Sequence, residues 1–116
     1  MTDTPCAKAI YWKALPGQFD AYTSYLRDEV EPIDHEAQRR GVLTRFCTLV
    51  DSRPDAPWTH MRVFEFSSTQ QRDALVPALA AIVAELTPDG ATRAQRSARA
   101  NGLRERVGEA DLGLLA

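Results

Sequence analysis

The chain of 116 residues has the length of one domain, and its 44% hydrophobic and 26% charged residues are typical of soluble globular proteins. Its formal net charge of -2 argues against nucleic acid or an anionic membrane as a partner. No apolar run approaches the roughly 20 residues that span a bilayer. The first residues do not resemble a signal peptide, so we expect a cytoplasmic protein.

A strand and then a long helix are predicted at the start of the chain. Residues 7–15 are rich in branched and aromatic side chains and end at Pro16-Gly17, which predicts a strand followed by a turn. Apolar residues then recur every three or four positions from Phe19 to Ile33, which predicts an amphipathic helix. Pro32 lacks the amide that a helix interior needs, so we expect a kink or a restart near Glu31.

Two further strands are predicted in the middle of the chain. Gly41 ends the first helix, and the β-branched and aromatic run at 42–50 predicts a second strand. A loop with two prolines follows, and "WTHMRVFEF" at 58–66 predicts a third strand. The two cysteines, Cys6 and Cys47, are expected to be free thiols, since neither belongs to a CxxC motif or has a histidine at zinc-ligand spacing.

The second half of the chain predicts a helix and a tail. Ser67 or Ser68 caps a helix over 69–87, in which Pro77 is expected to cause a bend. The chain then divides into a domain at 1–90 and a tail at 91–116, which we expect to be helical and to pack on the domain or on a partner subunit. Arginines three residues apart in the tail are interpreted as a solvated helix face.

The predicted order β-α-β-β-α resembles the dimeric α+β barrel superfamily. The resemblance rests on Leu15-Pro16-Gly17-Gln18-Phe19, on Gly41-Val42-Leu43 and on "RVFEFSSTQQRDAL", and it covers about residues 7–86. It implies a ferredoxin-like α+β fold with an antiparallel sheet, and a homodimer in which two sheets pack face to face. The superfamily includes antibiotic-biosynthesis monooxygenases, EthD-like and NIPSNAP-like proteins and stress-response dimers. Its last strand has no evident counterpart in the tail.

Alternation along the strands assigns side chains to two faces. We predict that Ile10, Trp12 and Ala14 face the helices and that six other side chains face the interior of the dimeric barrel. These six are Tyr11, Lys13, Arg45, His60, Arg62 and Phe64. A one-residue error in register would move every member of a strand to the other face.

These six side chains are the predicted site. His60, Arg62 and Tyr11 are the candidate catalytic residues, since histidine transfers protons near neutral pH and arginine or tyrosine can hold an anionic oxygen. Lys13, Arg45 and Phe64 are candidates for binding the substrate. The alternative is that the strand histidine and arginines face solvent or form cross-strand ion pairs.

Three functions remain open from the sequence. The first is a cofactor-independent monooxygenase or isomerase acting on an aromatic or polyketide-like substrate in the homodimer. The second is a stress-response dimer that binds a small ligand or haem, with His60 as the axial ligand. The third is a structural or interaction dimer with a filled barrel. We expect no resident cofactor and no metal, and the sequence contains no P-loop, GxGxxG, GxSxG or HExxH motif.

Overall fold

The computed structural model describes residues 4–115. Four strands and several helices make up the described residues, and both predicted helices are divided into shorter pieces. In chain order the elements are β1 (Cys6–Ala14), α1 (Phe19–Tyr25), the π-helical turn η1 (Leu26–Val30), α2 (Glu31–Arg39), β2 (Arg45–Val50), β3 (His60–Phe66), α3 (Thr69–Asp73), α4 (Leu75–Leu86), α5 (Gly90–Asn101) and β4 (Arg104–Gly113).

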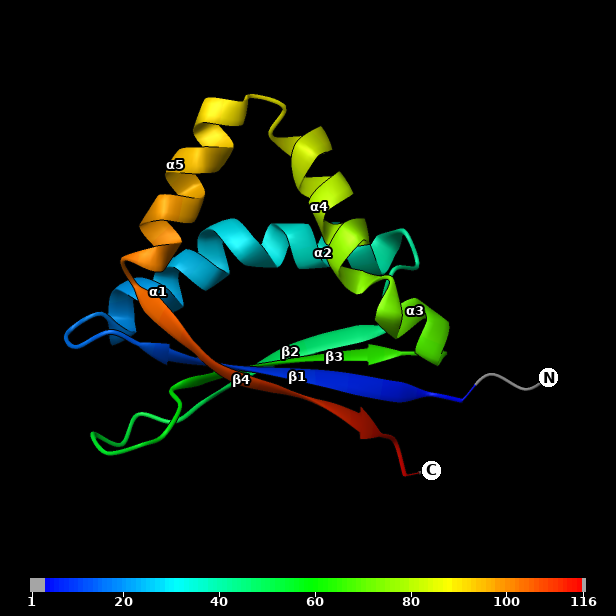
Figure 1. Cartoon of the computed structure of the whole chain (residues 1–116), viewed down its shortest axis with the longest axis horizontal. Helices are drawn as coiled ribbons and strands as arrows, with labels where there is room; N and C mark the ends of the chain where they lie inside the picture. The colour runs from blue at the N-terminus through cyan, green and yellow to red at the C-terminus, as the bar shows by residue number, and fades with distance from the viewer. Residues whose placement is uncertain (1–3, 116) are drawn as a thin grey trace.

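The four strands form one antiparallel sheet in the order β2-β3-β1-β4. β1 lies inside the sheet and pairs with β3 from Cys6↔Phe66 to Trp12↔His60. All the helices lie on one face of the sheet, and the opposite face, here called the free face, carries no helix (Figure 1). This arrangement is the ferredoxin-like α+β fold that the sequence predicted.

The predicted helical tail is correct only in its first half. α5 is helical, and Asp89 caps it by accepting hydrogen bonds from the amides of Ala91 and Thr92. Arg104–Gly113, however, is a strand that pairs with β1 along its whole length. Its alternating charges and two glycines hide any strand propensity, and the open edge of β1 supplies the partner that makes it a strand. The segment is therefore part of the sheet and not an appended helix.

The first helix restarts where the proline predicted it. η1 separates α1 from α2, and α2 begins at Glu31 with Pro32 in its first turn. A proline is tolerated there because the first amides of a helix have no partner inside the helix. The π-helical turn holds Leu26, which is buried, and Val30, which is half-buried, above the sheet.

The second helix is capped as predicted and broken near its proline. The Ser68 hydroxyl accepts a hydrogen bond of 3.1 Å from the amide of Gln71 at the start of α3. Pro77 has no amide to donate to the carbonyl of Asp73, four residues earlier, and α3 ends at Asp73. The predicted bend is therefore a break between two helices.

The core consists of two clusters of buried residues between the helices and the sheet. The first contains Cys6, Ala37, Leu43, Phe64, Phe66, Leu75 and Ile82. The second contains Ala14, Tyr22, Tyr25, Leu26 and Ala100. Both cysteines are free thiols, as predicted, with Cys6 buried in the first cluster and Cys47 exposed.

Candidate functional site

The structure divides the six predicted site residues between the two faces of the sheet. His60, Arg62 and Phe64 are buried under the helices, because β3 pairs Arg62 with Ile10 and His60 with Trp12. The predicted face is therefore right for β1 and wrong for β3. β3 alternates between buried and half-buried side chains, and the buried set combines His60 and Arg62 with Phe64 and Phe66, which a pattern of apolar residues could not reveal.

Tyr11, Lys13 and Arg45 lie on the free face, as predicted. The Tyr11 ring contacts the Trp58 ring at a centroid distance of 5.9 Å. Arg45 forms an ion pair of 3.7 Å with Glu65 on the neighbouring strand, and its side chain is 77% exposed. This is the cross-strand pairing that the sequence left open as the alternative.

His60 is fully buried and both of its ring nitrogens are engaged. Nε2 lies 2.8 Å from the Thr23 hydroxyl, which itself donates to the carbonyl of Phe19 at 2.9 Å. Nδ1 lies 2.7 Å from the Thr59 hydroxyl. Since the Thr23 proton is already used, Nε2–H donates to Thr23 and the Thr59 hydroxyl donates to Nδ1. The network thus selects one neutral tautomer of His60.

The environment of His60 also disfavours its charged form. The rings of Phe19 and Tyr22 contact the imidazole at centroid distances of 4.8 and 4.6 Å. Desolvation in this aromatic setting lowers the pKa of His60 to about 4. His60 is therefore neutral at physiological pH and has no free nitrogen for proton transfer or for iron.

A cavity of about 200 Å³ lies between the helices and the sheet. Its walls are mostly apolar, and members of both core clusters contribute to them. The apolar lining residues are Ile10, Trp12, Leu26, Val30, Ile33, Phe64, Leu79 and Val83, and the polar ones are Asp34, Arg62 and Arg104. Apolar walls with a few convergent polar groups are typical of small-molecule sites. We call this space the helix–sheet cavity.

Asp34 and Arg62 form a buried ion pair in the wall of this cavity. Their residues are 1% and 3% exposed, and both guanidinium nitrogens Nη1 and Nη2 donate to Oδ2 of Asp34, the first at 2.8 Å. Oδ1 takes part in neither bond. Burial raises the pKa of Asp34 above its usual value, while the Arg62 guanidinium acts in the opposite direction. The pair thus presents a carboxylate oxygen with an enhanced affinity for a proton.

Arg104 supplies the third polar group and comes from the strand that the sequence did not reveal. Its guanidinium lies 3.7 Å from the centroid of the Trp12 ring, and Nη1 donates to the Tyr22 hydroxyl at 3.0 Å.

The sequence analysis did not select Asp34, although it lies on a predicted helix. It lies four residues after Val30 and three before Ala37, on the apolar stripe of the helix, and a carboxylate on such a stripe is the signal that marks it.

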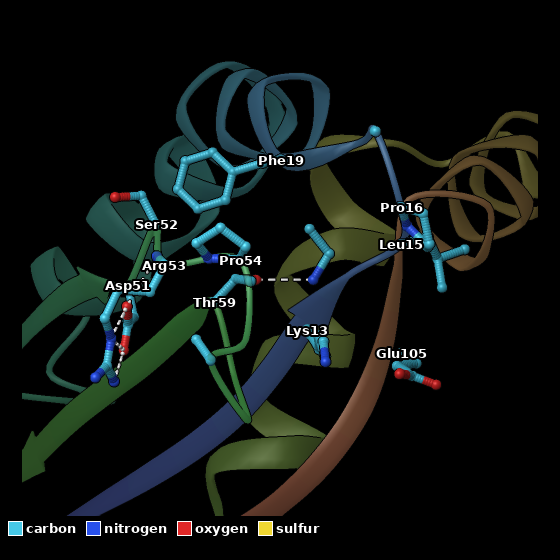
Figure 2. Close-up of a pocket in the computed structure, with 13 residues that line it drawn as sticks. Lys13, Leu15, Pro16, Phe19, Asp51, Ser52, Arg53, Pro54, Thr59 and Glu105 are labelled. Atoms are coloured by element: carbon cyan, nitrogen blue, oxygen red, sulfur yellow. Dashed lines mark hydrogen bonds and ion pairs between the residues drawn. The ribbon is translucent and has the colours of Figure 1, made fainter.

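A larger hollow of about 640 Å³ lies at the end of the sheet, between the turn after β1 and the loop before β3 (Figure 2). Lys13 is among its lining residues. Asp51 and Arg53, also in its wall, already pair with each other, at 2.6 Å between Oδ2 and Nη2. Most of the loop side chains around it are exposed. Water therefore screens charges in this hollow more strongly than charges in the helix–sheet cavity.

Among residues 4–115, no three His, Cys, Asp or Glu side chains lie together as ligands of a metal ion would. None of the helices described is both long and apolar enough to cross a bilayer.

Comparison with known proteins identifies a similar fold and no family. No family model matches the chain, and a search of curated proteins finds no match. The crystal structure of HapK from Hahella chejuensis is similar, with a TM-score of 0.60 over 95% of this chain and 92% of HapK. The two sequences are 15% identical, so the similarity concerns the fold alone.

Proposed function

We propose that this chain is a small-molecule protein whose ligand binds in the helix–sheet cavity. The observation that carries the proposal is a buried carboxylate–arginine pair in the wall of an otherwise apolar cavity. Burying such a pair requires several kcal/mol of desolvation per ion and rarely improves stability over apolar packing. The buried ion pair beside a cavity is therefore better explained by a role in ligand binding or catalysis than by a contribution to stability.

The size of the cavity favours a small ligand. Its volume of about 200 Å³ is below the roughly 300–1,000 Å³ of sites for drug-sized molecules. A single aromatic ring with a short polar substituent matches this volume better than a fused polyketide does. The Trp12 and Phe64 rings supply aromatic walls for such a ring.

The enzymatic form of the proposal is a cofactor-independent isomerase or monooxygenase that begins by removing a proton. Oδ1 of Asp34 would accept the proton from a carbon next to a carbonyl group. The positive charge of Arg62 would then stabilise the negative charge that develops on the carbonyl oxygen. For an isomerase, return of the proton to the oxygen completes the conversion of ketone to enol. In this scheme Asp34 replaces His60 as the base, and Arg62 keeps its predicted part.

The second candidate is a ligand-binding protein without catalysis. It is favoured by the two hydrogen bonds within the Asp34–Arg62 pair, which already satisfy much of its polar capacity. The haem-binding form of this candidate loses its predicted ligand, since both nitrogens of His60 are bonded to threonine hydroxyls.

We also propose that the free face is the contact surface of a homodimer, as the superfamily resemblance implies. Apolar side chains of all four strands lie on it, including Leu49, Met61, Val63 and Leu112. Leu49 and Leu112 are 49% and 44% exposed in the single chain. Contiguous apolar surface of this kind usually marks a contact with another protein.

The location of the ligand is tested by filling the cavity. Leu79→Trp places a larger ring among the lining residues, and Leu86→Trp on the same helix is the control because Leu86 is exposed. Phenol, acetophenone and phenylacetate are titrated while amide chemical shifts are recorded. We expect shifts at cavity residues in the wild type and in Leu86→Trp, and their loss in Leu79→Trp. Equal shifts in all three proteins would place the ligand elsewhere.

The enzymatic form is tested with phenylpyruvate, whose ketone and enol forms differ in ultraviolet absorption. We expect Asp34→Asn to slow tautomerisation by about 100-fold or more, the usual contribution of a general base. Asp28→Asn, an exposed carboxylate of η1, is the control. Because Asp34→Asn leaves Arg62 unpaired, Asp34→Glu is included as a second variant that keeps the charge and moves the carboxylate. Undiminished rates in both variants would exclude Asp34 as the base.

A further inference from the structure

Arg104 is a half-buried cation whose hydrogen-bonding capacity is only partly used. Its Nε atom is buried and has no hydrogen-bond acceptor among residues 4–115. The Tyr22 hydroxyl accepts from Nη1, and no carboxylate of the described residues forms an ion pair with the guanidinium. Leaving a buried donor without an acceptor is unfavourable, and more so when the donor belongs to a charged group. Such an atom in the wall of a cavity indicates a missing acceptor.

The charges that line the helix–sheet cavity do not cancel. Arg62 and Arg104 contribute two positive charges and Asp34 one negative charge, so the lining carries a formal charge of +1. Asp34 is bonded to Arg62, which leaves Arg104 as the cation without a counter-charge. At the wall of an apolar cavity, a cation without a counter-charge interacts strongly with an ion of opposite sign.

Aromatic rings flank the Arg104 guanidinium. Its Cζ atom lies 3.7 Å from the centroid of the Trp12 ring and 5.5 Å from the centroid of the Tyr22 ring. A guanidinium beside aromatic rings can still donate hydrogen bonds in its own plane, and Nη1 is the nitrogen already engaged, by the Tyr22 hydroxyl. A carboxylate is the anion that fits the edge of a guanidinium, because its two oxygens accept from two parallel N–H groups.

We propose that Arg104 binds the carboxylate of the ligand, and that the ligand is a small apolar monocarboxylate whose ring or chain occupies the helix–sheet cavity. This inference rests on the proposed function, since it takes the cavity as the ligand site. Arg62 remains bonded to Asp34 when the ligand enters. The residue that binds the acid group is thus separate from the Asp34–Arg62 pair. It belongs to β4, an edge strand of the sheet.

The test compares phenylacetate with phenylacetamide, which has nearly the same shape and no charge. Dissociation constants are measured by calorimetry for the wild type, Arg104→Gln, Arg104→Lys and the control Arg106→Gln. Arg106 lies on the same strand, but it pairs with Glu109 and does not line the cavity. Thermal unfolding of each variant shows that it is folded.

We expect the wild type and Arg106→Gln to bind phenylacetate more tightly than phenylacetamide. Arg104→Gln should weaken phenylacetate binding by roughly 10- to 100-fold, as for loss of a hydrogen bond to a charged group, and leave phenylacetamide binding unchanged. Arg104→Lys should be intermediate, because lysine keeps the charge and loses the planar pair of donors.

The remaining outcomes separate this inference from the proposal on which it rests. If the amide binds as tightly as the acid, or if Arg104→Gln binds phenylacetate like the wild type, the assignment of Arg104 is wrong and the cavity remains the ligand site. If neither compound binds the wild type, both the inference and the cavity proposal are contradicted.

Discussion

His60 shows how burial changes the chemistry of a single residue. As a free side chain it titrates near neutral pH, and for that reason the sequence suggested it as an acid or base. In the fold two threonine hydroxyls and two aromatic rings surround it and hold it neutral. Arg62, two residues later on the same face, is instead bonded to the Asp34 carboxylate. Two polar residues on one strand face are thus buried with different kinds of partner.

The burial of His60 predicts a pH dependence of stability. Its pKa is about 4 in the folded chain and 6.5 as a model value, so the unfolded chain binds the proton more readily. Stability should be highest above pH 6.5 and fall by about 3 kcal/mol as the pH decreases to 4. Urea unfolding at several pH values measures this loss.

His60→Gln is the matched variant for this measurement, because glutamine can hydrogen-bond to both threonines and does not titrate. Its stability should change less than that of the wild type between pH 6.5 and 5. The carboxylates with lowered pKa values, such as Asp51 and Asp89, contribute mainly at lower pH. Parallel pH profiles for the two proteins would mean that His60 is accessible to protons in the folded state.

At the scale of elements, η1 and β4 build the cavity. The π-helical turn contributes Leu26 and Val30 to its wall, and β4 contributes Arg104. π-Helical turns occur mostly within α-helices and frequently at functional sites. β4 also converts β1 from an edge strand into an inner strand, which anchors Trp12 below the Arg104 guanidinium.

Hydrogen exchange of the backbone amides tests the position of β4. If β4 pairs with β1, amides along Cys6–Ala14 are bonded on both sides and should exchange slowly. β2 is the internal control, because it is an edge strand and its outward amides should exchange faster. Fast exchange at alternate residues of β1, equal to that of β2, would show that β1 is an edge strand and that Arg104–Gly113 does not pair with it.

At the scale of the whole molecule, the sheet has one covered face and one free face (Figure 1). The helices and the helix–sheet cavity belong to the covered face. The free face carries apolar side chains bordered by charged pairs such as Arg45–Glu65. The proposed ligand site therefore lies within one chain, and the proposed dimer contact lies on the opposite side of the sheet.

This separation predicts the effect of a charge on the free face. Val63→Asp places a carboxylate on an inner strand of that face and should convert a dimer into a monomer, because burying an unpaired charge in an interface is costly. Val76→Asp is the control, since Val76 is 70% exposed on α4. Analytical ultracentrifugation measures the masses. A Val63→Asp dimer as tight as the wild type would place the contact elsewhere.

The sequence by itself determined the local features of this protein. Pro16-Gly17, Pro32, Gly41 and Ser68 act on the backbone next to them, so the turn, the restart of the first helix, its end and the cap of α3 were all predictable. The order of the first five elements and the α+β fold followed from these signals. The face of β1 was also predictable, because Ile10, Trp12 and Ala14 on its helix-facing side are apolar.

Only the tertiary structure decided which polar side chains are buried and that the last segment of the chain forms the fourth strand of the sheet. The face of β3 was mispredicted because the partners that bury His60 and Arg62 under the helices, Thr23 and Asp34, come to them from α1 and α2. β4 has little strand propensity of its own and forms because β1 offers an unpaired edge. Both features depend on contacts between residues far apart in the chain, and local sequence patterns do not contain that information.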